Sequence, residues 1–118
     1  MRIVEIRSYN LQPGSRPAFD AVMSNEAVPM LRRQRVDVVA YGPSPHDDDS
    51  YYLLRAYDDL AERQRSQDAF YGSREWREGP RERLIAPIVS YTSVVLPMSE
   101  PMIAELRKAG DAAAVSSS

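Results

Sequence analysis

The sequence contains no cysteine, a single histidine and a single tryptophan, and it has no long run of apolar residues. The lack of cysteine excludes disulfide bonds, cysteine-based zinc sites and thiol catalysis, and it fits a reducing compartment. No apolar run approaches the roughly 18 residues that a membrane-spanning helix needs, so we expect no membrane as a partner. A strand-like segment starts at Ile3 and leaves no room for a signal peptide, which predicts a cytoplasmic protein.

The chain also lacks an excess of charge of either sign. Its formal net charge is −2, with 15 basic and 17 acidic residues. Nucleic-acid binding depends on the neutralisation of phosphates, so we expect no nucleic acid as a partner. The sequence has no glycine-rich phosphate loop, no nucleophile elbow and no Ser-His-Asp order, which argues against a hydrolase or a nucleotide enzyme.

What is present is a chain of 118 residues, of which 43% are hydrophobic and 27% are charged. Such a chain is typical of one soluble domain with a core of its own. The segment 3–10 organises it, because two kinds of side chain alternate there as they do on the two faces of a strand. The smaller, mostly apolar set is Val4, Ile6 and Ser8. The hydrogen-bonding set is Glu5, Arg7 and Tyr9.

Further strand and helix signals follow this segment. Apolar residues at spacings of three and four predict a helix over 16–33, which Pro29 should kink or divide. Apolar and β-branched runs predict strands over 36–41, 51–57 and 90–96. The two middle strands should form a hairpin around a polar loop.

Helices are also predicted after the third strand and at the C-terminus. Asp59 and Glu62 resemble a capping box at the start of a helix, and Ser73 can cap a short helix that carries Trp76. Residues 98–108 predict a peripheral helix, and the Ala- and Ser-rich tail after it is expected to be mobile. We therefore divide the chain into a domain over 1–97 and a peripheral helix with a flexible tail over 98–118.

The order β-α-β-β-α-β is the ferredoxin-like pattern of an α+β protein. It predicts a four-stranded antiparallel sheet with strand order 4-1-3-2 and both crossover helices on one face. We expect the opposite face to be bare and to present the polar and aromatic set Glu5, Arg7, Tyr9, Tyr51, Leu53, Arg55 and Tyr57. The simplest way to cover such a face is a twofold homodimer with sheet against sheet.

Several residues in this order resemble the NIPSNAP family over about residues 2 to 96. They are Glu5-x-Arg7-x-Tyr9, Leu11, Pro13-Gly14, Pro29, Gly42-Pro43, Tyr52 through Arg55, and Ser73-x-x-Trp76. The resemblance implies a dimeric α+β barrel, with a homodimer and a cavity between sheet and helices or between sheets. Its superfamily includes cofactor-independent monooxygenases, haem-degrading enzymes, lactone isomerases and dehydratases, so fold alone does not decide the function.

The candidate ligand-binding residues are the polar and aromatic side chains expected near that cavity. They are Glu5, Arg7, Tyr9, Tyr41, Arg55, Tyr57 and Trp76. Guanidinium groups bind planar oxyanions, and aromatic rings suit a small apolar or aromatic molecule. This predicts a small-molecule-binding homodimer, and an enzyme of the monooxygenase or isomerase type without a cofactor is one form of it. The alternative is a non-catalytic structural or interaction dimer, in which the ionic residues form an internal salt bridge and Trp76 is a core residue.

Two candidate chemistries are weak on sequence grounds. Glu5 is a poor general base, because the two nearby guanidinium groups should lower its pKa. His46 precedes Asp47-Asp48-Asp49 in the polar loop, where acidic residues are commonly solvated and a lone histidine is a weak metal or haem ligand. We therefore expect no metal and no haem.

Overall fold

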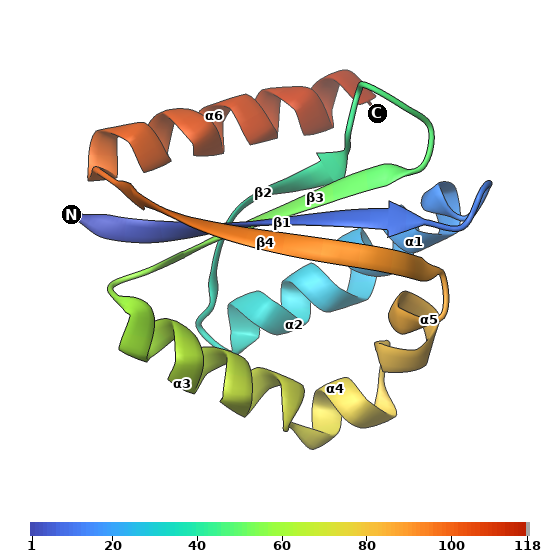
Figure 1. The fold of residues 1–118 in the computed structure, drawn as a ribbon, viewed down its shortest axis with the longest axis horizontal. Coiled ribbons are helices and arrows are strands. Elements are labelled where there is room, and N and C mark those ends of the chain that lie inside the picture. Colours follow the sequence, from blue (N-terminus) through green and yellow to red (C-terminus); the bar gives the residue numbers. More distant parts are fainter. Residues whose placement is uncertain (118) are drawn as a thin grey trace.

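The computed structural model describes residues 1–117, with side chains described for residues 1–113. Four strands form one sheet, and helices lie on both sides of it (Figure 1). The strands are β1 Arg2–Leu11, β2 Asp37–Pro43, β3 Ser50–Tyr57 and β4 Ile88–Met98. The helices are α1 Arg16–Val22, the π-helical turn η1 Met23–Ala27, α2 Val28–Arg33, α3 Leu60–Tyr71, α4 Arg74–Glu78, α5 Arg81–Ile85 and α6 Glu100–Ser117. None of the helices in this described part is long and apolar enough to cross a membrane.

The sheet is antiparallel with the order β2-β3-β1-β4, which confirms the predicted ferredoxin-like arrangement. In the register of β1 and β3, Glu5 lies opposite Arg55 and Arg7 lies opposite Leu53. These two central strands therefore place the predicted polar set on one face, as their alternation indicated.

The prediction that this face is bare is wrong. Helices α1 to α5 cover it, and Tyr9, Leu53 and Tyr57 are buried against them in the larger hydrophobic core (Figure 1). The alternation of β1 was interpreted correctly, but the inward face was assigned to the wrong set. The polar set includes large aromatic side chains, and these are buried against the helices.

The opposite face carries the smaller apolar set and is partly covered by α6. Ile103 is fully buried against Val4 and Ala56 in a second, smaller core. The helix lies along β2, where Arg107 donates to Asp37 at 2.8 Å and Arg2 donates to the same carboxylate at 2.9 Å. The helix continues through most of the segment that the sequence assigned to a flexible tail.

The helical segment over 16–33 is divided as Pro29 predicted. A π-helical turn over Met23–Ala27 lies directly before α2, and Pro29 is the second residue of that helix. Proline has no N–H and its ring clashes with the carbonyl four residues earlier, so the wider turn lets the chain continue without a break. Met23 and Ala27 are buried on the side of this turn that faces the sheet.

Strand β4 is the exposed edge of the sheet. Its apolar side chains include Val89, Tyr91, Val94 and Leu96, which are 60%, 56%, 51% and 39% exposed. Pro97 lies inside this strand and does not end it, and an edge strand tolerates proline because one row of its backbone groups has no partner strand. A long apolar edge of this kind is suited to contact with another chain.

Candidate functional site

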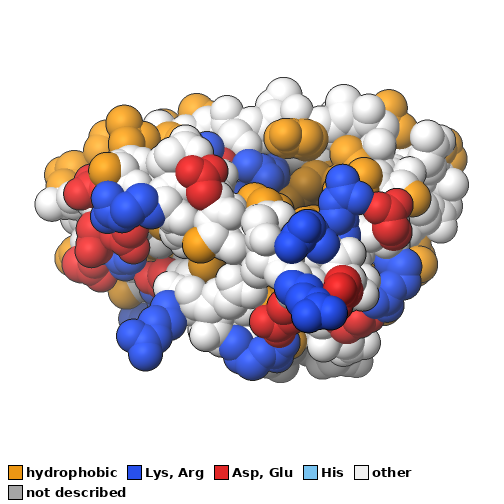
Figure 2. All heavy atoms as spheres, turned by 90° about the horizontal axis from the view of Figure 1, so that it is seen from below, with side chains coloured by type: hydrophobic (Ala, Val, Ile, Leu, Met, Phe, Trp, Pro, Cys, Tyr) orange, Lys and Arg blue, Asp and Glu red, His pale blue; other side chains and the backbone are white. Residues whose placement is uncertain are grey.

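A cavity of about 460 Å³ lies between the sheet and its helical layer. Figure 2 shows this side of the molecule, where apolar side chains lie in a recess bordered by basic ones. The lining residues of the cavity that carry polar atoms are Arg7, Tyr9, Gln67, Tyr71, Trp76, Arg81 and Tyr91. Its other walls are apolar side chains from β3, β4 and the helices, so the cavity has an apolar body and a small polar part.

Aromatic rings form the wall beneath α3 and α4. The Ser73 hydroxyl accepts a hydrogen bond from the Trp76 backbone N–H, which starts α4 as predicted and fixes the place of the indole. The Trp76 ring lies 5.3 Å from Phe70 and 5.4 Å from Tyr71, measured between ring centroids. Trp76 is thus both a core residue and a wall of the cavity.

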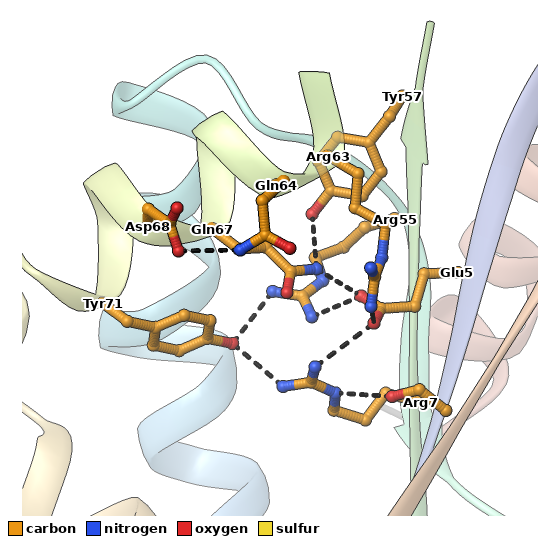
Figure 3. A network of polar contacts seen from close by, with 10 residues as sticks. Glu5, Arg7, Arg55, Tyr57, Arg63, Gln64, Gln67, Asp68 and Tyr71 are labelled. Carbon is orange, nitrogen blue, oxygen red and sulfur yellow. Dashed lines mark hydrogen bonds and ion pairs between the residues drawn. The ribbon is translucent and has the colours of Figure 1, made fainter. Parts of the chain in front are cut away.

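The polar part of the cavity continues into a buried ionic network centred on Glu5 (Figure 3). One carboxylate oxygen accepts hydrogen bonds from Arg55 at 2.6 Å and from Gln67 at 2.7 Å. The other accepts from Arg63 at 2.7 Å and from Arg7 at 3.2 Å. Four donors from β1, β3 and α3 therefore meet at one fully buried carboxylate.

These donors keep Glu5 ionised. Burial alone would raise the pKa of Glu5, but the charge of Arg55 and the hydrogen bond from Arg63 outweigh it and lower the pKa to about 2. A carboxylate with so low a pKa accepts protons poorly at neutral pH. Glu5 is therefore an anchor for guanidinium groups and not a general base.

Arg7 and Tyr71 connect the network to the cavity. The Tyr71 hydroxyl oxygen accepts hydrogen bonds from Arg7 at 3.2 Å and from Arg55 at 3.0 Å (Figure 3). Arg7 also donates to the Ser93 hydroxyl at 3.1 Å, and its guanidinium lies 5.0 Å from the centre of the Tyr91 ring. Both Arg7 and Tyr71 line the cavity, so the positive charge of Arg7 reaches its surface.

The cavity also contains a phenol that stays neutral. Burial is the main cause that raises the pKa of Tyr9, to about 12, although the guanidinium groups of Arg55 and Arg7 act against it. Tyr9 therefore keeps its proton at neutral pH, and its phenol can serve as a hydrogen-bond donor in the cavity.

The structure divides the predicted site residues into three groups. Arg7, Tyr9 and Trp76 line the cavity. Glu5 and Arg55 lie in the network behind it, and Tyr57 is joined to that network through Gln67 at 3.4 Å.

Tyr41 lies apart from the other predicted site residues. It stands on β2 and lines a second cavity of about 380 Å³ at that edge of the sheet. The wall of this second cavity also includes Tyr52 and Gly110, which come from β3 and α6.

Sequence reasoning missed the contribution of α3. Arg63, Gln67 and Tyr71 all bond to the network, and they recur every fourth residue on one helix face. That spacing was present in the sequence, but only the start of this helix, at Asp59 and Glu62, was singled out there. Three polar residues at this spacing indicate a polar helix face that meets a partner.

His46 lies away from both cavities. It is in the exposed loop after β2, where its ring contacts the Ser44 hydroxyl at 2.6 Å and the Asp47 carboxylate at 3.2 Å. Asp47 itself accepts from the backbone N–H groups of Asp49 and Ser50, which makes it a turn residue. Within residues 1–117, no group of three or more His, Cys, Asp or Glu side chains is placed to hold a metal.

The fold and the cavity define an α+β domain of the ferredoxin-like type with an internal polar network. The NIPSNAP family model matches residues 4–99, and the chain belongs to this family. A search of curated proteins gives no significant match.

Solved structures of the family agree with this assignment. A NIPSNAP-like domain protein from Burkholderia xenovorans is 26% identical, with a TM-score of 0.75 over 84% of this chain and 87% of the other. A NIPSNAP family protein from Agrobacterium tumefaciens is 17% identical, with a TM-score of 0.76 over the same shares. A Bordetella bronchiseptica protein provisionally named as an antibiotic biosynthesis monooxygenase is 22% identical, with a TM-score of 0.66 over 83% and 97%.

Proposed function

We propose that the protein binds a small, flat, mostly apolar molecule that carries an oxygen-containing polar group. The observation that carries this proposal is the cavity of about 460 Å³, which has apolar and aromatic walls and a polar part formed around Arg7. A cavity of this size is within the range of small-molecule sites, which combine apolar walls with a few well-placed polar groups.

The polar groups also support a chemical role. Arg7 and the neutral phenol of Tyr9 are placed to stabilise negative charge that develops on a carbonyl oxygen of the bound molecule. An isomerase or a cofactor-independent monooxygenase forms such an oxyanion, and the provisional names of the more distant structural relatives are of the monooxygenase type. The low pKa of Glu5 excludes it as the group that removes the proton.

A second copy of the chain completes this proposal. On the sheet face that α6 covers only in part, Val94 of β4 lies opposite Ile6 and Leu96 lies opposite Val4. An exposed apolar strip next to an unpaired strand edge favours an isologous contact with a second copy. The proposed assembly is therefore a homodimer in which each subunit has its own cavity.

The alternative is a structural or interaction dimer without a ligand. It is supported by the network itself, because Glu5 and Arg55 are fully buried, and an ionic network of this kind needs no ligand. Under this alternative the cavity has no occupant, and removal of Arg55 lowers stability or dissociates the dimer with no ligand able to restore it.

Tryptophan fluorescence separates the two possibilities, because Trp76 is the single tryptophan and lines the cavity. The probe is 2-acetylnaphthalene, a flat aromatic ketone. We expect saturable quenching with a Kd below about 1 mM, the limit of weak specific binding. Quenching that rises linearly without saturation would contradict ligand binding and favour the structural dimer.

A further inference from the structure

Tyr71 is the residue at which the aromatic wall and the ionic network meet. It is the last residue of α3, and its ring packs edge-on against Phe70 at 5.0 Å and Trp76 at 5.4 Å. These contacts hold the ring in the wall of the cavity, while its hydroxyl reaches the guanidinium groups of Arg7 and Arg55 (Figure 3).

The hydroxyl of Tyr71 has an unused proton. Its oxygen accepts two hydrogen bonds, one from each of these guanidinium groups, at 3.2 and 3.0 Å. A phenol can also donate one hydrogen bond, and no acceptor for it lies among the residues that the structure describes. Because Tyr71 lines the cavity, a bound molecule is the natural acceptor.

The local charge indicates what kind of acceptor fits. In the network as far as it is described, the Glu5 carboxylate faces three guanidinium groups, from Arg7, Arg55 and Arg63. Arg81 also lines the cavity, but its charge is paired with the Glu82 carboxylate. One carboxylate does not balance the three guanidinium groups around Glu5, and an anion bound at this end of the cavity would reduce the excess.

Two further members of the network offer no donor to the cavity. The Gln67 amide donates to Glu5 at 2.7 Å and to Tyr57 at 3.4 Å. Arg55 is fully buried and does not line the cavity. Within the network, the Tyr71 hydroxyl is therefore left as a donor at the cavity, beside the charge of Arg7 and the phenol of Tyr9.

We propose that the Tyr71 hydroxyl donates a hydrogen bond to an oxyanion of the ligand, so that the cavity selects flat aromatic carboxylates over their neutral analogues. This inference rests on the proposed small-molecule function and names its substrate class. Arg7 and Arg55 position the phenol by donating hydrogen bonds to its oxygen. The two guanidinium charges also favour an anion at the place where the phenol O–H would donate.

The test compares 2-naphthoate with its neutral analogue 2-naphthamide by isothermal titration calorimetry. The variants are Tyr71→Phe, which keeps the ring and removes the hydroxyl, and Tyr52→Phe, which removes a phenol outside the main cavity. We expect the wild-type protein and Tyr52→Phe to bind 2-naphthoate about tenfold more tightly than 2-naphthamide. In Tyr71→Phe the affinity for 2-naphthoate should fall about tenfold, which is the typical effect of one hydrogen bond to a charged group.

Three other titration results would contradict the role proposed for Tyr71. If the wild-type protein binds both probes equally and Tyr71→Phe changes neither Kd, the proposed function stands and this inference is wrong. If Tyr71→Phe weakens both probes equally, the phenol has a structural role only, and thermal melting will show the matching loss of stability. If the wild-type protein binds neither probe, the proposed function fails and the inference fails with it.

Discussion

At the scale of single residues, the central feature is one carboxylate that is shared by three guanidinium groups. Glu5 is fully buried, so its charge depends on these partners. A buried charge that loses its partner is costly, whereas a complete network contributes little net stability. The network therefore fixes the relative positions of β1, β3 and α3 more than it stabilises the domain.

The pH dependence of stability should report on Glu5. Its pKa is about 2 in the folded protein and near the ordinary glutamate value of 4.5 in the unfolded chain. A lowered pKa contributes stability that is fully present above pH 4.5 and is lost as pH falls towards 2. We expect a loss of about 3 kcal/mol over this window, measured by urea denaturation at a series of pH values.

Glu5→Gln is the variant that tests this assignment. It should lower the free energy of unfolding by about 3–5 kcal/mol at pH 7, because three guanidinium groups lose their counter-charge. The difference from the wild-type protein should shrink as pH falls from 4.5 to 2. Glu26→Gln is the control, because it removes a carboxylate from an exposed pair with Arg83. An equal pH dependence in Glu5→Gln and the wild-type protein would contradict the assignment.

Arg55 and Arg7 contact the same carboxylate but should differ in their roles. Arg55 is fully buried, whereas the Arg7 side chain is 13% exposed and lines the cavity. Arg55→Met should reduce the free energy of unfolding by about 3–5 kcal/mol. Arg7→Met should cost only about 1 kcal/mol, because Arg7 is partly exposed and makes the longest of the four contacts with Glu5, at 3.2 Å. Chemical denaturation measures the free energy of unfolding of both variants. A larger loss in Arg7→Met than in Arg55→Met would contradict these roles.

At the scale of elements, α6 has the largest effect on the shape of the molecule. It covers one side of the second sheet face and lies along β2 (Figure 1). Gly110 lets it approach closely, because a Cβ atom at this position would lie 2.7 Å from the Cβ of Ala40. Asp37 holds the same helix through Arg107.

Gly110→Ala tests the close approach. An alanine in a helix normally gains about 1 kcal/mol over glycine. Here the clash with Ala40 should turn this gain in stability into a loss, so that the free energy of unfolding falls by about 1–3 kcal/mol. Ala109→Gly on the exposed side of the helix is the control and should cost about 1 kcal/mol. A gain in stability from Gly110→Ala, measured by denaturation, would show that α6 does not pack in this way.

At the scale of the whole molecule, the sheet ends in an apolar edge on β4. Val94 and Leu96 are exposed in the single chain, and Val94 lies opposite Ile6 on β1. The same strand carries Tyr91 at the cavity, so the proposed contact between two copies lies close to the proposed ligand site.

Val94→Asp tests the proposed homodimer. A charge in the centre of an apolar contact should convert the dimer to a folded monomer, because an unpaired carboxylate would be buried. Light scattering coupled to size-exclusion chromatography measures the mass, and circular dichroism shows that the chain remains folded. Ala61→Asp, on the exposed side of α3, is the control and should leave the dimer intact. A wild-type protein that elutes as a monomer at micromolar concentration would overturn the proposal.

The sequence predicted many of the residues that form the site, but it predicted fewer of the contacts that they make. The alternation of β1 placed Glu5, Arg7 and Tyr9 on one face, and the register confirms that Glu5 meets Arg55. Arg63 and Gln67 were not predicted, because they reach Glu5 across 58 and 62 residues of chain. Such contacts depend on where the crossover helix α3 lies, which local periodicity does not specify.

The sequence by itself determined the order of strands and helices, the sheet topology that this order implies, and the separation of each central strand into two chemically different faces. Only the tertiary structure decided which face is inside. Alternation shows that two faces differ, but burial depends on what covers each face, and here five short helices cover the polar and aromatic set while α6 covers the small apolar set. The cavity has the same origin, because it is the space left between those helices and the large side chains beneath them.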